Sequence, residues 1–243
     1  MRTILEICAG DIVSVRAAAD AGAQRVEVCS ALALGGLTPS VGFIREAVSV
    51  RGMTVHVLIR HREGDFVYSE AEVRAMERDI AAAADAGAHG VVVGALLPDG
   101  TIDMATCRRL VSAAKGRGLR VTFHRAFDRV QSPERALEQV IELGCDYLLT
   151  SGCAPSALEG APLLQRLRVM AAGRITIIAA AGINSGNAAE VVHRSGCTQI
   201  HASARSAAPS AMEFHRHAVA MGSADGERLT TDFEEVTKIL SVI

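Results

Sequence analysis

The chain has 243 residues and a formal net charge of −2, and 49% of its residues are apolar although only 3% are aromatic. This length is close to the roughly 250 residues of a typical α/β barrel, and small aliphatic side chains suit parallel strands that helices cover. A nearly neutral chain without a basic, aromatic-rich stripe argues against nucleic-acid binding. No apolar run reaches the roughly 18 residues that cross a bilayer, and Glu6 interrupts the apolar start, so we expect neither a membrane span nor a signal peptide.

The six cysteines are spaced without any CxxC pair, which argues against a zinc ribbon and a thioredoxin-type site. Because no export signal is present, we expect a cytoplasmic protein whose thiols stay reduced. Most of these cysteines are then expected to be small buried side chains. They are Cys8, Cys29, Cys107, Cys145, Cys153 and Cys197.

The predicted elements begin with an apolar strand at residues 3–8. A junction then recurs seven times along the chain, in which a helix-like run is followed by a glycine and an apolar strand. Two copies are nearly identical, ADAGAQRVEV and ADAGAHGVVV. Glycine just past a helix end accepts the left-handed conformation, and the spacings of 23 to 35 residues match a βαβ unit of about 30 residues. The junction glycines are Gly22, Gly52, Gly87, Gly118, Gly144, Gly173 and Gly196.

Seven junctions and the opening strand predict eight parallel strands that alternate with helices. An open doubly wound sheet can also hold eight strands, but no GxGxxG sequence opens the first helix and no linker divides the chain. We therefore predict a single (β/α)8 TIM-barrel domain over residues 1–243. Ser69 and Glu72 form a capping-box pattern before the third helix, and Ser132 followed by Pro133 predicts the start of the fifth.

A long segment rich in alanine, serine and glycine follows the eighth predicted strand, at about residues 204–229. Its histidines, His215 and His217, are expected to lie at the surface. The chain then ends in a predicted amphipathic helix, because apolar residues recur there at helical spacing. These residues are Phe233, Val236, Ile239 and Leu240.

The first two strands carry a repeated polar pattern on their inner face, since side chains of a barrel strand alternate between the lumen and the helix layer. In the first strand, Leu5 and Ile7 are expected to face the helices. Glu6 and Cys8 have the opposite parity and point inward. The second strand repeats this Glu-x-Cys pattern 21 residues later, at residues 27–29. Adjacent strands are expected to bring the two pairs close together.

Inward polar groups gather from at least five strands at the barrel mouth, by which we mean the C-terminal ends of the strands. Sites of TIM-barrel proteins lie at this end, so the pattern favours a functional pocket. Alternatively, the two glutamates simply pair with Arg60 or Arg125 inside the barrel. The candidate catalytic residues, which include the HRAFD segment after the fifth strand, are Glu6, Glu27, His56, Arg60, His124, Arg125, Asp128 and His201.

The loops after the seventh and eighth strands offer a candidate anion site, since barrels often hold phosphate there. They read AAAGINSGN and SARS. Gly182 lets backbone N–H groups approach an anion, whereas Asn184 is equally well explained as a helix cap. The candidate anion-binding residues are Ser151, Gly182, Asn184, Ser203 and Arg205.

Cys8 and Cys29 form a candidate metal site. Two thiolates on adjacent strands can bind a soft cation such as Cu(I). The alternative is that both are buried core thiols without a ligand.

Several motifs resemble the CutC family, in order and over nearly the whole chain. They are LEICAGD near the start, RVEVCSALALGGLTPSVG at 25–42, HVLIRHREGDFVYS at 56–69, TFHRAFD at 122–128, LLTSG at 148–152 and IHASAR at 200–205. The resemblance implies a cytoplasmic TIM barrel that takes part in copper homeostasis and forms dimers or higher oligomers. It also implies that Cys8 and Cys29 are Cu(I) ligands and that the candidate catalytic residues match the polar mouth of the family.

Two functions of different kinds follow from these patterns. The first is copper handling through the two thiols. The second is an enzyme, of unassigned reaction, that acts on a small anionic carboxylate or phosphate metabolite. In the second, an inward glutamate would be the general base and His124 or His201 the general acid. Arg60 and Arg125 would clamp the anion. A binding barrel without turnover is a third interpretation.

Overall fold

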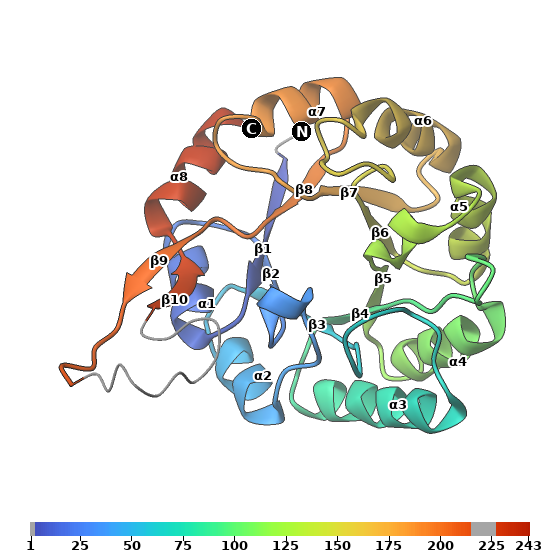
Figure 1. Cartoon of the computed structure of the whole chain (residues 1–243), viewed down its shortest axis with the longest axis horizontal. Helices are drawn as coiled ribbons and strands as arrows, with labels where there is room; N and C mark the ends of the chain where they lie inside the picture. Colours follow the sequence, from blue (N-terminus) through green and yellow to red (C-terminus); the bar gives the residue numbers. More distant parts are fainter. Residues whose placement is uncertain (1–2, 215–226) are drawn as a thin grey trace.

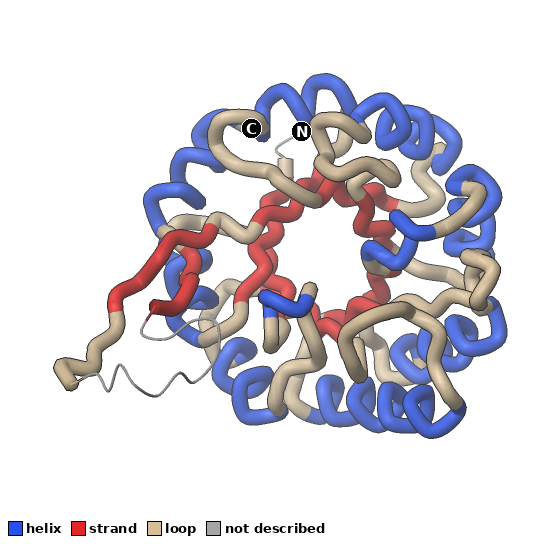
Figure 2. The backbone as a smooth tube through the Cα atoms, viewed as in Figure 1, coloured by secondary structure: helices blue, strands red, loops and turns tan. Residues whose placement is uncertain are grey.

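A computed structural model describes residues 3–214 and 227–243. Its eight parallel barrel strands pair in chain order and close between β8 and β1, and helices surround them as an outer ring (Figure 1 and Figure 2). The prediction of a TIM barrel is confirmed. The strands are β1 (Ile4–Ala9), β2 (Arg25–Val28), β3 (Thr54–Leu58), β4 (Gly90–Val93), β5 (Arg120–Phe123), β6 (Tyr147–Thr150), β7 (Thr176–Ala180) and β8 (Gln199–Ala202).

The two predicted helix starts in the outer ring are confirmed. Ser69 caps α3 in a capping box with Glu72, and α5 begins at Pro133. The seven junction glycines all have positive φ, between 66° and 94°, as a chain that turns from a helix into a strand requires. The helices are α1 (Ile12–Asp20), α2 (Val41–Val48), α3 (Glu70–Asp85), α4 (Met104–Lys115), α5 (Pro133–Glu142), α6 (Ala161–Ala171), α7 (Ala188–Ser195) and α8 (Phe233–Val242), with short 3-10 helices η1 (Leu32–Leu34) and η2 (Arg125–Arg129).

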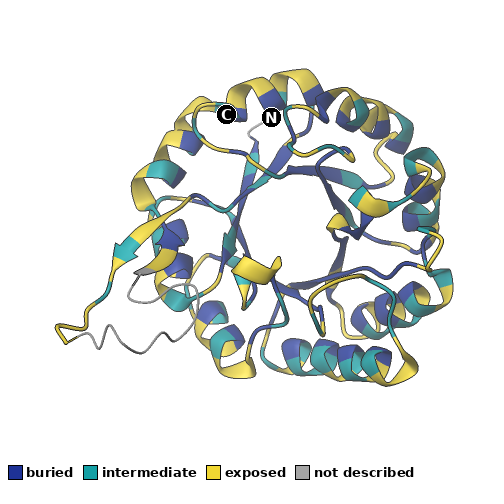
Figure 3. Ribbon diagram, viewed as in Figure 1, coloured by how far each residue is buried: buried dark blue, intermediate teal, exposed yellow. Residues whose placement is uncertain are grey.

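The apolar core lies between the barrel and the helix ring. Strand residues with outward parity, such as Leu5, Ile7 and Val26, are fully buried there. Figure 3 shows buried residues along the strands and exposed residues on the outer faces of the helices. The inner face of the barrel carries polar side chains together with small apolar clusters, such as Leu149 with Ile178.

The strand register sets which inner side chains become neighbours. Glu6 lies opposite Arg25 of β2 and opposite His201 of β8. Cys8 lies opposite Glu27, and Glu27 lies opposite His56 of β3. The register thus places the inner residues of β1, β2 and β8 side by side at successive heights in the lumen.

The segment after β8 contains a feature that the sequence did not predict. β9 (Arg205–Pro209) and β10 (Glu227–Thr231) pair as an antiparallel ribbon, which extends away from the barrel in Figure 1. β9 is mostly exposed and lacks alternating apolar residues, so it carries no strand pattern. The predicted final helix is confirmed as α8, in which Val236 and Ile239 are fully buried.

His215 and His217 lie outside the described residues. None of the helices in the two described ranges is long and apolar enough to cross a membrane.

Candidate functional site

Glu6 lies at the centre of a buried charge cluster in the lumen. Its carboxylate accepts hydrogen bonds from Nε of Arg25 and, at 2.7 Å, from Nδ1 of His201. Arg25 also donates to Oε1 of Gln199 at 2.7 Å, and its guanidinium lies 4.8 Å from the ring centroid of Tyr147. Each charge of the cluster therefore has a partner inside the barrel.

Arg25 is a member of this cluster that the sequence patterns did not predict, although they contain a signal for it. It precedes Glu27 by two residues on β2, so it has the same inward parity. The alternative prediction paired the glutamates with Arg60 or Arg125. For Glu6 that pairing is wrong, because the partner is Arg25.

The charges in this cluster displace the pKa values of Glu6 and His201 in opposite directions. Burial alone would raise the pKa of Glu6, but Arg25 and His201 hold it well below its ordinary value. Burial alone would lower the pKa of His201, but hydrogen bonds to Cys8 and Glu6 raise it well above its ordinary value. At neutral pH the cluster therefore holds a carboxylate with an imidazolium and a guanidinium.

One layer closer to the mouth, two thiols and a carboxyl group converge. The sulfur atoms of Cys8 and Cys29 are 3.3 Å apart, and a carboxyl oxygen of Glu27 lies within 4.8 Å of both. Nε2 of His201 is 3.7 Å from Oε2 of Glu27. These three residues are the only group among those described that offers three metal-ligand atoms in one place.

Proton affinities within this second layer differ strongly. The hydrogen bond with Cys29 lowers the pKa of Cys8 to about 5, and the pKa of Cys29 is raised well above its ordinary value by the same bond. Burial raises the pKa of Glu27 to about 8, and the nearby Cys8 thiolate adds to this effect. Near pH 7 the layer thus contains one thiolate, one thiol and a largely protonated carboxyl group.

A cavity of about 270 Å³ opens above this layer. Its walls combine the two thiols with cationic and imidazole side chains on other strands and with apolar residues. Among the predicted site residues, the cavity is lined by Cys8, Glu27, Cys29, Arg60, His124, Arg125, Gly182, His201, Ser203 and Arg205. The predicted metal residues, several catalytic candidates and part of the predicted anion site therefore share one cavity.

Five predicted site residues do not line this cavity. Glu6 lies in the charge cluster, and His56 is fully buried nearby with Nδ1 4.0 Å from Glu6. Asp128 lies in η2 after β5, where it accepts from the backbone N–H of Ser151 in the loop after β6. Asn184 stabilises its own turn by accepting from the N–H of Gly186.

Several backbone N–H groups of the loop after β7 are already engaged by the protein itself. Its backbone N–H group at Ser185 donates to Glu235 at 2.7 Å, and that at Asn184 donates to the side chain of Asn187 at 2.9 Å. Asp232 caps the first turn of α8 at the same place. Side chains of the protein itself thus occupy donors that TIM barrels often offer to phosphate.

Replacing Glu27 by glutamine is expected to change how stability depends on pH. The pKa of Glu27 is raised from 4.5, its ordinary value, to about 8 in the folded protein. Between pH 4.5 and 8 the folded protein therefore keeps a proton on Glu27 that the unfolded chain has lost. The free energy of unfolding of the wild type thus falls as pH rises through this range. Glutamine does not titrate, so the variant lacks this pH dependence. Its free energy of unfolding should rise relative to that of wild type by more than about 1 kcal/mol between pH 4.5 and 8. Urea denaturation across this range measures the difference. A difference in free energy of unfolding between the two proteins that stays the same from pH 4.5 to pH 8 would contradict the raised pKa of Glu27.

Alkylation should distinguish Cys8 from Cys153. The pKa of Cys8 is about 5, whereas burial raises that of Cys153 to about 11. Since the thiolate is the nucleophile, the rate of Cys8 with iodoacetamide should change less than about twofold between pH 6.5 and 8.5, while that of Cys153 rises about 100-fold. Mass spectrometry of peptides gives both rates from one sample. Cys29→Ser should move the midpoint of the pH–rate curve of Cys8 to higher pH. A tenfold rise in the alkylation rate of wild-type Cys8 per pH unit would contradict the prediction.

Comparison with known proteins identifies the family. The CutC family model matches residues 3–206. A family protein CutC from Vibrio campbellii is 47% identical over 225 residues, which are 93% of this chain and 91% of the relative. Another from Chromobacterium violaceum is 49% identical over 223 residues, which are 92% of this chain and 90% of the relative. A solved Streptococcus agalactiae structure, described as a candidate copper homeostasis protein CutC, is 32% identical with a TM-score of 0.78, covering 83% of this chain and 98% of that one. The chain therefore belongs to the CutC family.

Proposed function

We propose that the protein binds Cu(I) through Cys8 and Cys29 and takes part in copper handling. The observation that carries this proposal is the 3.3 Å separation of the two sulfur atoms in the wall of an open cavity. Thiolates are the ligands that Cu(I) prefers, and they bind metal in the deprotonated form. The low pKa of Cys8 supplies one thiolate at neutral pH before any metal arrives.

The ligand set supports a soft monovalent cation over zinc. A structural zinc site needs four nitrogen, sulfur or oxygen ligands in tetrahedral geometry. The cluster offers two sulfur atoms and the oxygen of Glu27, whose raised pKa leaves it largely protonated near pH 7. Two sulfur ligands suffice for Cu(I), so Glu27 is not required as a ligand.

Anaerobic competition for Cu(I) with a chromophoric chelator tests this proposal. Wild-type protein is expected to withdraw one Cu(I) per chain from the chelator, and Cys8→Ser, Cys29→Ser and the double variant should not. Cys153→Ser is the matched control, because this thiol belongs to the loop after β6 and does not line the cavity. Wild-type protein that binds no more Cu(I) than the double variant would refute the proposal.

A second candidate function is catalysis on a small anionic molecule in the same cavity. The observation that favours it is the position of His201, between Glu6 at 2.7 Å and Glu27 at 3.7 Å. Glu6 holds Nδ1 of the imidazolium, and His201 lines the cavity, where a general acid would meet its substrate. Incubation with a mixture of small carboxylates and phosphate esters, followed by proton NMR, tests for turnover. Consumption of a compound by wild type but not by His201→Gln would support catalysis, and no consumption would contradict it.

We also propose a cytoplasmic location. All six cysteines lie within the described residues and are free. Free thiols are typical of a reducing compartment and support this location.

A further inference from the structure

We propose that the cavity holds a small oxyanion, a carboxylate or phosphate group, bound by Arg60 and His124. This inference rests on the second candidate function, a small anionic molecule in this cavity, names the groups that bind it and requires no metal or turnover. Arg60 and His124 come from the ends of β3 and β5, and both line the cavity that Cys8 and Cys29 also line. An anion bound there would therefore share one chamber with the thiol pair.

Arg60 is a buried cation without a counter-ion among the described residues. It is 7% exposed, and it donates only to backbone carbonyl groups, those of Leu34 and Gly36 at 3.1 Å and of Gly64 at 2.9 Å. Its Nε has no hydrogen-bond partner within residues 3–214 and 227–243. Burying a charge is costly unless an opposite charge compensates it, so an anionic ligand would supply what the protein does not.

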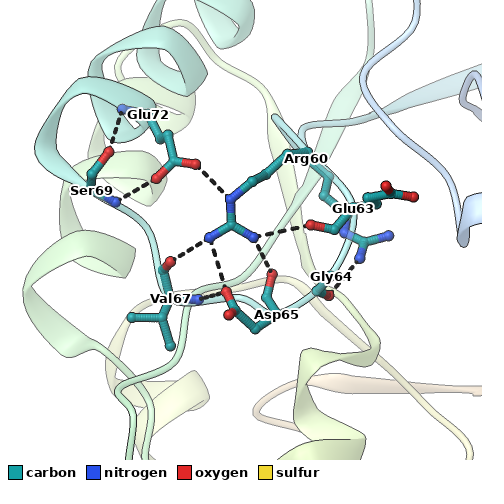
Figure 4. A network of polar contacts seen from close by, with 8 residues as sticks. Arg60, Glu63, Gly64, Asp65, Val67, Ser69 and Glu72 are labelled. Atoms are coloured by element: carbon teal, nitrogen blue, oxygen red, sulfur yellow. Dashed lines mark hydrogen bonds and ion pairs between the residues drawn. The ribbon is translucent and has the colours of Figure 1, made fainter.

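A comparison with Arg25 shows that this arrangement is unusual for the barrel. Arg25 is the other buried arginine of the described residues, and its charge is matched by Glu6. Arg62, two residues after Arg60, binds the carboxylates of Asp65 and Glu72. Figure 4 shows Arg60 beside Gly64 and next to this carboxylate network. Carboxylates are thus available close by, yet none in the described part of the chain forms an ion pair with Arg60.

His124 supplies a neutral hydrogen-bond donor on the same wall. Its Nδ1 accepts from the backbone N–H of Ala126 at 3.2 Å, which leaves the proton of the neutral ring on Nε2. Nε2 is buried and has no hydrogen-bond partner in the part of the chain that the structure describes. Burial, together with the charge of Arg60, lowers the pKa of His124 to about 3, so the ring stays neutral. The structure therefore presents an unused N–H donor next to an uncompensated cation.

Phe66 fixes the two groups relative to each other. Its ring centroid lies 5.0 Å from Cζ of Arg60 and 5.0 Å from the ring centroid of His124. Arg125, which the sequence suggested as a second clamp, is half-exposed and already binds Asp128 at 2.7 Å. The anion is thus assigned to Arg60 and His124 rather than to two arginines.

NMR of the histidine side chains in wild-type protein tests the inference directly. Metal-free protein labelled with ¹⁵N-histidine is titrated at pH 7 with sodium acetate, inorganic phosphate or sodium chloride at matched ionic strength. His124→Gln identifies the His124 signals by their loss. A saturable shift of Nε2 with acetate alone or phosphate alone supports the inference and names the anion, and a shift with both supports an oxyanion site of either kind. No saturable shift with either anion would overturn it.

Variants then test which side chains bind the anion, with affinity taken from melting-temperature shifts. Arg60→Met should weaken binding about 10- to 100-fold, as expected for a lost charge-assisted hydrogen bond. Arg62→Met, which removes a nearby arginine with its own carboxylate partners, should leave the affinity unchanged. Because Arg60→Met also leaves three carbonyl groups without a donor, His124→Phe is a second variant expected to weaken binding. Equal affinities in Arg60→Met, His124→Phe and wild type would overturn the assignment.

Substitutions are expected to abolish anion binding and Cu(I) binding independently of each other. The double variant Cys8→Ser, Cys29→Ser should lose Cu(I) and keep wild-type affinity for the anion within about twofold. Loss of anion binding in this double variant would contradict the assignment to Arg60 and His124. Loss of anion binding in Arg60→Met, with Cu(I) binding intact, would support it.

Discussion

Replacing Glu6 by leucine is expected to lower the free energy of unfolding at pH 7 by about 3–5 kcal/mol, the usual range for removing one partner of a buried ion pair. The substitution leaves Arg25, which is 4% exposed, without a carboxylate. His201 can respond by losing its proton, but the guanidinium of Arg25 cannot. Urea denaturation followed by circular dichroism measures the change.

Two matched variants separate the charge from the packing. Glu27→Gln changes a glutamate on the neighbouring strand whose raised pKa keeps it largely protonated near pH 7, so this variant should not be destabilised. Combining Glu6→Leu with Arg25→Met removes both charges and should recover part of the loss. A loss below about 1 kcal/mol in Glu6→Leu would mean that water or another group compensates Arg25.

The number and order of barrel strands could be predicted because they depend on local signals. Each junction glycine marks a helix end by its own backbone conformation, and the alternation of Leu5 and Ile7 with Glu6 and Cys8 is local too. Parity along each strand is enough to place the polar residues on the inner face. The thiol pair follows from the same reasoning, because β1 and β2 are neighbours.

The partners of the inner residues could not be predicted, because they depend on the stagger between strands. Glu6 lies opposite Arg25 and not opposite Glu27, so the two glutamates lie at different heights in the lumen. Cavity access depends on loops as well. Asp128 belongs to a conspicuous polar motif, yet its carboxylate faces the loop after β6 and not the cavity of the thiols. Sequence patterns indicate which residue types face inward, whereas register and loop conformation decide what each one contacts.

Replacing Asp128 by alanine is expected to destabilise the protein by about 2–4 kcal/mol, because each buried donor left without an acceptor costs about 1–3 kcal/mol. The carboxylate accepts from the hydroxyl of Thr150 and from the backbone N–H groups of Ser151 at 3.0 Å and Cys153 at 3.2 Å. It also binds Nε of Arg125 at 2.7 Å. Alanine would leave the start of this loop without its acceptor, and urea denaturation at pH 7 measures the loss.

Asp103→Ala is the matched control for Asp128→Ala. Asp103 caps α4 by accepting from one backbone N–H group, that of Thr106 at 3.0 Å, so its loss should cost only about 1 kcal/mol. The sequence suggests Asp128 as a catalytic residue, and the two roles predict different results. A structural role lowers stability and leaves Cu(I) and anion affinity of the folded variant near wild type. Unchanged stability together with weakened ligand binding would instead assign Asp128 to the functional site, to which its ion pair with Arg125 connects it.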